Sequence, residues 1–165
     1  MTRAVRFVLA ILFLTPTLAP ADDRDRESLR DLDGVRVKVE DLPPILESKG
    51  LSSDLLRKAV ESKLEQAGIR VMNAGEFPVG DPFLDVQITA TQEAAKLIGY
   101  NVEVKFIQIV FLRRNPAFTF NLAETWRAKG HMELVPTARA ADDIRKELSD
   151  QVDQFIAAFR SVNRK

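Results

Sequence analysis

Residues 100–134, YNVEVKFIQIVFLRRNPAFTFNLAETWRAKGHMEL, decide the fold of this 165-residue chain. Apolar side chains alternate with polar ones along much of both halves of the stretch, which is the pattern of a strand buried on one face. The Asn-Pro-Ala sequence at 115–117 separates the halves and predicts a long β-hairpin. This hairpin holds the chain's only tryptophan, Trp126, and its only histidine, His131, so its register determines whether the two side chains meet.

The predicted register places Trp126 in the core and His131 outside it. Directly paired residues of an antiparallel ladder point to the same face, and a three-residue loop sets Phe106 opposite Trp126. The same register sets Lys105 beside Arg127, which is a like-charge pair on the polar face. We therefore expect Trp126 to be a structural residue and His131 to be an ordinary exposed strand residue.

Gln108 and Glu124 form the first feature that a simple hairpin does not explain. The register places them opposite each other among apolar neighbours, so they are a candidate buried polar pair. A buried carboxyl group must be hydrogen-bonded or protonated, and carboxyl groups with perturbed pKa values cluster at functional sites. The structural alternatives are a hydrogen-bonded pair, or a bulge that turns Glu124 outward.

Ile107, Ile109 and Phe111 form the second such feature. They lie on the face that is polar at the other end of the same strand, so this half of the strand is apolar on both sides. Either one of the protein's own helices covers the three side chains, or they are a candidate partner surface for another protein or an apolar ligand.

The rest of the chain supplies two amphipathic helices and three further strands. Residues 51–68 have a serine N-cap, an apolar stripe at every fourth residue and a C-terminal glycine, and residues 140–163 have a similar stripe. Short alternating stretches predict strands at 35–39, 69–73 and 83–91. The order β-α-β-β-β-β-α predicts an α+β fold: a single domain with a mixed sheet, a long hairpin and two helices packed on the sheet.

The first 21 residues have the organisation of a secretory signal peptide. Arg3 and Arg6 precede an apolar run at 7–14, and Ala19-Pro20-Ala21 offers small residues for cleavage. The apolar run of about eight residues is shorter than the roughly 20 that span a bilayer as a helix. We expect a signal peptide at 1–21, a charged flexible leader at 22–31 and one domain at 32–165.

The composition limits the cellular compartments and the classes of partner that we expect for this protein. Removal of Arg3 and Arg6 leaves 22 basic against 24 acidic side chains, which disfavours nucleic acid as a partner. The chain has no cysteine, so it has no disulfide and no acylated cysteine as a lipid anchor. These features favour a secreted, periplasmic protein with no membrane span after cleavage of the signal peptide.

Motifs of known catalytic or cofactor sites do not occur in the sequence. One histidine without cysteine does not supply a zinc site, and no glycine pattern predicts a nucleotide cradle. No Gly-x-Ser-x-Gly elbow is present. We expect no catalytic residues, no cofactor and no metal, although an enzyme with an unrecognised carboxylate site remains an alternative because carboxylate pairs meet in space.

Two stretches resemble bacterial envelope proteins. LRKAVESKLEQAGIRV, residues 56–71, followed by FLDVQITAT is similar to the helix–strand pattern of the lipopolysaccharide-assembly lipoprotein and of the N-terminal module of the Tol translocation protein. ETW at 124–126 with DQFIAAFRSVN at 153–163 resembles uncharacterised proteobacterial secreted proteins. The resemblance implies an envelope location and no particular activity, and it carries over no functional residue.

The resulting hypothesis is a non-catalytic periplasmic binding or accessory module that acts on a component of the cell envelope. The partner is an unknown envelope protein. The alternative is a small carrier that holds an apolar ligand between its sheet and a helix.

Export gives the first testable prediction. Because small residues at 19–21 follow a short apolar run, cleavage should leave a mature chain that begins at Asp22 in the periplasmic fraction. N-terminal sequencing of that fraction measures this directly. Recovery of an intact Met1 in the membrane pellet would contradict it.

Overall fold

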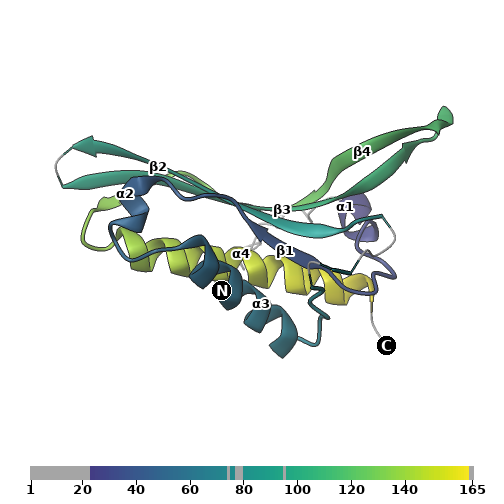
Figure 1. Cartoon of the computed structure of the whole chain (residues 1–165), viewed down its shortest axis with the longest axis horizontal. Helices are drawn as coiled ribbons and strands as arrows, with labels where there is room; N and C mark the ends of the chain where they lie inside the picture. The colour runs from purple at the N-terminus through teal and green to yellow at the C-terminus, as the bar shows by residue number, and fades with distance from the viewer. Residues whose placement is uncertain (1–22, 74, 77–79, 95, 164–165) are drawn as a thin grey trace, which may run out of the picture.

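The computed structural model describes residues 23–73, 75–76, 80–94 and 96–163, which form one α+β domain with an open five-stranded mixed sheet. Figure 1 shows the helices on one side of this sheet. The expected fold class is confirmed, whereas the expected signal peptide at 1–21 lies outside the described residues. The elements in chain order are α1 (Asp23–Glu27), β1 (Arg36–Val39), α2 (Pro44–Glu47), α3 (Ser53–Gln66), β2 (Phe83–Ala94), β3 (Leu97–Leu112), β4 (Asn115–Arg127), β5 (Glu133–Pro136) and α4 (Ala140–Val162).

Strand β3 organises the sheet. One of its edges pairs with β2 from Leu97 to Ile107, and its other edge is shared by β5 and β4 in succession. All of these pairings are antiparallel, whereas the short strand β1 pairs with β2 in parallel and forms the end of the sheet.

Gln151 of α4 closes the gap that β4 and β5 leave along β3. Its side-chain oxygen accepts a hydrogen bond from the Val104 amide at 3.0 Å, and its side-chain nitrogen donates to the Val102 carbonyl at 2.8 Å. A Cβ atom at Gly130, which crosses this gap, would lie 2.5 Å from the Gln151 nitrogen. The side chain of Gln151 thus takes the place of a neighbouring strand, and the crossing chain must have glycine there.

Helix α3 forms as its sequence predicts. The Ser52 hydroxyl accepts a hydrogen bond from the Leu55 amide at 3.3 Å and caps the helix, and Gly68 has a φ of 79° just past its end. The stripe of Leu56, Val60 and Leu64 is buried against the sheet.

Helix α4 holds the centre of the sheet through aromatic packing. Phe155 lies 5.7 Å from Phe106 and 5.3 Å from Trp126 between ring centroids, and the contact with Trp126 is edge to face. Trp126 is buried and pairs with Phe106, so both its predicted burial and its predicted partner are confirmed.

Two predicted strands differ from the structure. Residues 69–73 contribute one parallel bridge, Val71 to Val35, instead of a strand. The second hairpin strand divides into β4 and β5, because the chain leaves β3 at Gly130 and returns with its alternation reversed. A continuous strand would place Met132 and Leu134 on the buried face of Trp126, because all three are even-numbered; with the alternation reversed, both are exposed.

The expected flexible leader at 22–31 is wrong for the part of it that the structure describes. Helix α1 occupies its first half, and Leu29 is completely buried in the core. The Asn163 side chain donates to the Leu29 carbonyl at 2.7 Å, which ties the leader to the end of α4. Because most of the leader is charged, its sequence did not indicate that Leu29 is buried.

In the part of the chain that the structure describes, no helix combines the length and the hydrophobicity that a membrane crossing requires.

Replacement of Trp126 tests the core. Trp126→Ala removes the ring that packs between β3 and α4, so the free energy of unfolding should fall by about 3–5 kcal/mol. Urea unfolding measures the loss. Leu55→Ala, at an exposed leucine on α3, is the matched control and should change the value by less than about 0.5 kcal/mol. A similar effect of both substitutions would contradict the assignment of Trp126 to the core.

Candidate functional site

The β3–β4 hairpin continues past the aromatic cluster as a two-stranded ribbon, which we call the distal ribbon: residues 107–112 of β3 and 115–124 of β4. Figure 1 shows it rising away from α4 at the right of the view, on the far side of the sheet from the helices. A two-stranded ribbon is of marginal stability without packing against other elements. The distal ribbon is thus the part of the sheet with the least support from the rest of the protein.

Bulges in β4 shift the pairing register of the distal ribbon. The predicted register holds for Lys105–Arg127 and Phe106–Trp126, but Ile107 then pairs with Glu124, which leaves Thr125 as an extra residue in β4. Further shifts follow toward the tip. All of these extra residues are in β4, so the alternation of β3 stays regular.

The first bulge overturns the predicted buried pair of Gln108 and Glu124. Glu124 turns outward and forms two hydrogen bonds with Arg127, at 2.8 and 2.7 Å, and the ion pair with Arg127 lowers the pKa of the glutamate. Gln108 instead donates to the Thr125 hydroxyl at 3.0 Å and to the Ser28 carbonyl at 3.1 Å. The pair is therefore two separate structural contacts, one of them with the leader.

Ile107, Ile109 and Phe111 do share the face that the sequence predicted. Phe111 is 66% exposed, and the two isoleucines are partly exposed. Neighbouring backbone accounts for part of their cover: Ile107 pairs with Phe83 of β2, and the Ile109 amide donates to the Gly80 carbonyl at 2.7 Å. Among the described helices none lies on this face of the sheet (Figure 1).

The tip and the second strand extend the exposed surface. Leu122 of β4 is 50% exposed, and the turn between the strands consists of Arg113 and Arg114, both exposed. The distal ribbon therefore combines exposed apolar side chains with two positive charges at its end.

The middle of the same sheet face is polar and its charges are paired. Glu103 lies between Lys105, with which it forms an ion pair, and Arg127, which is 4.0 Å away. The hydrogen bond from Lys105 lowers the pKa of Glu103. The like-charge contact of Lys105 with Arg127 that the sequence predicted is thus offset by two glutamates, Glu103 and Glu124.

Asp85 is the buried acid of this face. One of its carboxylate oxygens has no hydrogen-bond partner among the described residues. Burial raises the pKa of Asp85, and the nearby Glu40 adds to this effect, while Lys38 and Lys105 oppose it. Asp85 therefore holds a proton more tightly than an exposed aspartate does, and the acid–base group hydrogen-bonded to it is a second acid, Glu40.

The only histidine lies in a short hydrogen-bonded chain with a glutamate and a tyrosine. Glu133 bonds the His131 ring nitrogen at 2.8 Å and accepts from the Tyr100 hydroxyl at 2.9 Å. Burial raises the pKa of Tyr100 above its ordinary value, so its hydroxyl stays a donor. His131 is exposed, as expected, but it lies in the connection between β4 and β5 and not in a strand, whereas Trp126 pairs with Phe106 of β3.

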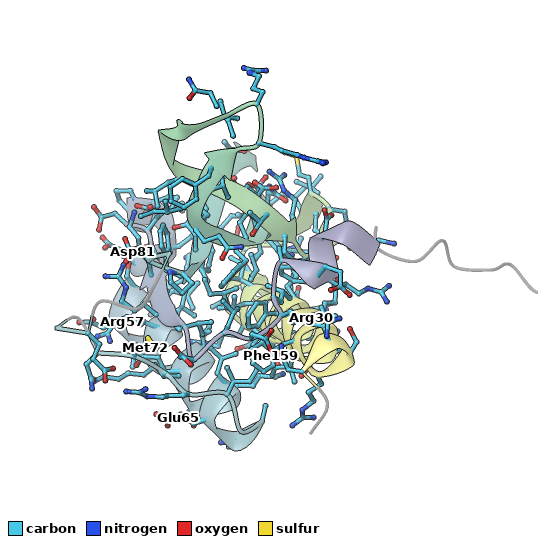
Figure 2. The ribbon with its side chains drawn as sticks, turned by 90° about the vertical axis from the view of Figure 1, so that its right-hand side faces the viewer. Arg30, Arg57, Glu65, Met72, Asp81 and Phe159 are labelled. Carbon is cyan, nitrogen blue, oxygen red and sulfur yellow. The ribbon has the colours of Figure 1, made fainter. Side chains whose placement is uncertain are left out.

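Hollows of the described surface differ in character. Two of them are open: one of about 660 Å³ is lined by Arg57, Glu65 and Met72 among others, and one of about 810 Å³ by Arg30 and Phe159 among others. Figure 2 labels these five residues. An apolar hollow of about 160 Å³ lies between α3 and α4. Within the described ranges, no group of three or more histidines and acids is placed to hold a metal ion.

Replacement of Asp85 tests whether this buried acid lowers the stability of the folded protein at neutral pH or is a functional acid. Its raised pKa means that the folded protein binds the proton more tightly than the unfolded chain does, so Asp85 favours folding at low pH and this advantage disappears as the pH rises above about 4. Asp85→Asn should therefore increase the free energy of unfolding at pH 7 and have little effect near pH 3. Asp41→Asn, at a nearby exposed position, is the control. A loss of stability at pH 7 would contradict the assignment.

Comparison with known proteins adds no assignment to these features: no family model matches the chain, and no curated protein matches it.

Proposed function

We propose that the protein is a non-catalytic binding or accessory module of the periplasm, and that its distal ribbon docks on another protein of the cell envelope. The observation that carries this proposal is the exposure of Phe111, with Ile107 and Ile109 beside it, on a face that has no helix. The periplasmic location rests on the secretory pattern of residues 1–21 and on the absence of cysteine.

Energetics favour a partner for this face. Each large apolar side chain that stays in water forgoes about 1.5–3 kcal/mol of burial. In the distal ribbon the exposed Phe111 shares its face with the partly exposed Ile107 and Ile109, whereas single exposed leucines such as Leu55 are ordinary on a protein surface. A protein that packs on the ribbon would bury this surface and would also hold the two strands together.

The positive charge at the tip of the distal ribbon limits the kinds of protein surface that can dock there. Arg113 and Arg114 form no salt bridge with a described residue, and they lie next to the apolar face. Arginine is frequent at protein interfaces because it forms paired hydrogen bonds with carboxylates. The complementary surface should be apolar with an acidic border.

The carrier hypothesis has less support. An apolar ligand of ordinary size needs a pocket of roughly 300–1,000 Å³, and the apolar hollow between α3 and α4 has about 160 Å³. The space between sheet and helices is filled by fully buried side chains, of which Tyr100, Phe106 and Phe155 are the largest.

Two substitutions test the docking surface. Ile109→Lys and Phe111→Lys place a charge in the proposed interface, so each should abolish co-purification of the envelope partner. Because these side chains have little cover from the protein itself, the melting temperature should fall by less than about 2 °C. Leu55→Lys, at an exposed leucine on α3, should leave both properties unchanged. Affinity isolation from the native envelope, native mass spectrometry and circular dichroism melting give the measurements.

Either of two results would refute the docking proposal. A steep fall in melting temperature for Phe111→Lys would mean that the ribbon belongs to the protein's own core. Binding of the wild-type protein, but not of Phe111→Lys, to phosphatidylglycerol vesicles would mean that the ribbon meets a lipid surface and not a protein.

A further inference from the structure

The indole of Trp126 has a hydrogen-bond donor that the fold does not use. Its Nε1 atom is buried and has no hydrogen-bond partner among the described residues, and the residue as a whole is only 3% exposed. An indole N–H can only donate, and a buried tryptophan usually has an acceptor for it. A buried donor without an acceptor lowers stability, so an acceptor at this position would be bound favourably.

A hollow of about 370 Å³ is lined by Trp126, and we call it the indole hollow. Its size is within the range of small-molecule sites. The end of β4, helix α1 and the second half of α4 contribute the other lining residues. Helix α1 packs against both α4 and β4, so the three elements enclose one space (Figure 1).

Helix α4 gives the indole hollow a floor with two methyl groups. Gln154, Ala157, Ala158 and Ser161 lie at helical spacing on one face of the helix. Ala157 and Ser161 are exposed, so the hollow opens to the surface. The polar groups of this floor have partners within the protein: Gln154 accepts from the Lys129 amide at 2.9 Å and donates to the Lys129 carbonyl at 3.1 Å, and the Ser161 hydroxyl donates to the Ala158 carbonyl at 2.6 Å.

None of the described residues that line the indole hollow is an acid, whereas three of them are basic. The charge of Arg127 is compensated by Glu124, which is 2.7 Å away. Arg26 and Lys129 also have interactions within the protein, so they lend an anion moderate support. An anion in the hollow would thus meet an N–H donor and no negative side chain of the lining.

We propose that the indole hollow binds a small aliphatic carboxylate, with one carboxylate oxygen accepting a hydrogen bond from the Trp126 indole and the hydrocarbon part lying on Ala157 and Ala158. Hydrogen bonds to a charged acceptor are stronger than those to a neutral one, which favours a carboxylate over an alcohol or an amide. A phosphate fits less well, because the hollow extends to Ser161 in the last turn of α4, where the helix dipole opposes a second negative charge.

This site is independent of the docking surface proposed for the distal ribbon. Trp126 packs against α4, whereas Phe111 lies on the face of the sheet that has no described helix. The ligand is a charged molecule at the margin of the core, and not the enclosed apolar ligand of the carrier hypothesis.

The indole itself reports on binding. Because Trp126 is the only tryptophan of the chain, the purified protein gives one indole cross-peak in a nitrogen–proton NMR spectrum. Sodium hexanoate should move this cross-peak saturably at millimolar concentration, together with the amide cross-peaks of Ala157 and Lys129. Hexylammonium chloride has the same hydrocarbon chain and the opposite charge, and it should leave the indole cross-peak in place, as should sodium chloride at equal ionic strength.

Three variants locate the site. Trp126→Phe keeps an aromatic ring in the core but removes the donor, so the affinity for hexanoate, measured at the Ala157 amide, should fall about tenfold or more. Ala157→Leu fills the hollow from an exposed position and should abolish binding with an unchanged melting temperature. Ala59→Leu, at an exposed position of α3, is the matched control and should bind hexanoate as the wild type does.

Phe111→Lys separates this inference from the docking proposal, since it should lose the envelope partner and still bind hexanoate with wild-type affinity. Three results would overturn the inference. One is an indole cross-peak that hexanoate does not move. Another is an equal response to hexanoate and hexylammonium, because the carboxylate would then have no role. The third is undiminished affinity of folded Trp126→Phe or of Ala157→Leu.

Discussion

The packing of Phe155 on Phe106 and Trp126 is the contact on which the rest of the structure depends. It joins the long C-terminal helix to strands β3 and β4 at one point, directly before the first bulge of β4. On one side of this point the sheet is supported by α3 and α4, and on the other side the two strands continue without such support. The same contact thus defines the core and the start of the exposed ribbon.

The docking surface proposed for the distal ribbon lies where packing stops. Among the described helices, none lies on the face of Phe111. The neighbouring part of the same face is polar, and its charges are paired around Glu103. The change from paired charges to apolar side chains along β3 thus marks where this surface begins.

Local rules predicted the regular parts of the fold. The cap and the apolar stripe of α3 follow from the spacing of its residues. The pairing of Phe106 with Trp126 follows from the length of the hairpin loop. Ile107, Ile109 and Phe111 share a face because they are alternate residues of β3, and the bulges opposite β3 all lie in β4. The bulge at Thr125 was not predictable in this way, since contacts of the leader with β4 and with Gln108 accompany it. The single bridge between Val71 and Val35 also escaped prediction, because it depends on where residues 69–73 leave the sheet.

The side chain of Gln151 occupies the place of a neighbouring strand, and this arrangement limits how the sequence can evolve. The segment between β4 and β5 is a surface connection, and such connections usually accept substitutions and changes of length. Here Gly130 has no room for any side chain as long as Gln151 reaches the backbone of β3. A shorter residue at 151 would remove the closest contact, but the Val102 carbonyl oxygen would still lie 3.0 Å from a Cβ atom at position 130, and the Val102 and Val104 groups would lose their partner. Related chains should therefore keep both residues, although one lies in a connection and the other in the core.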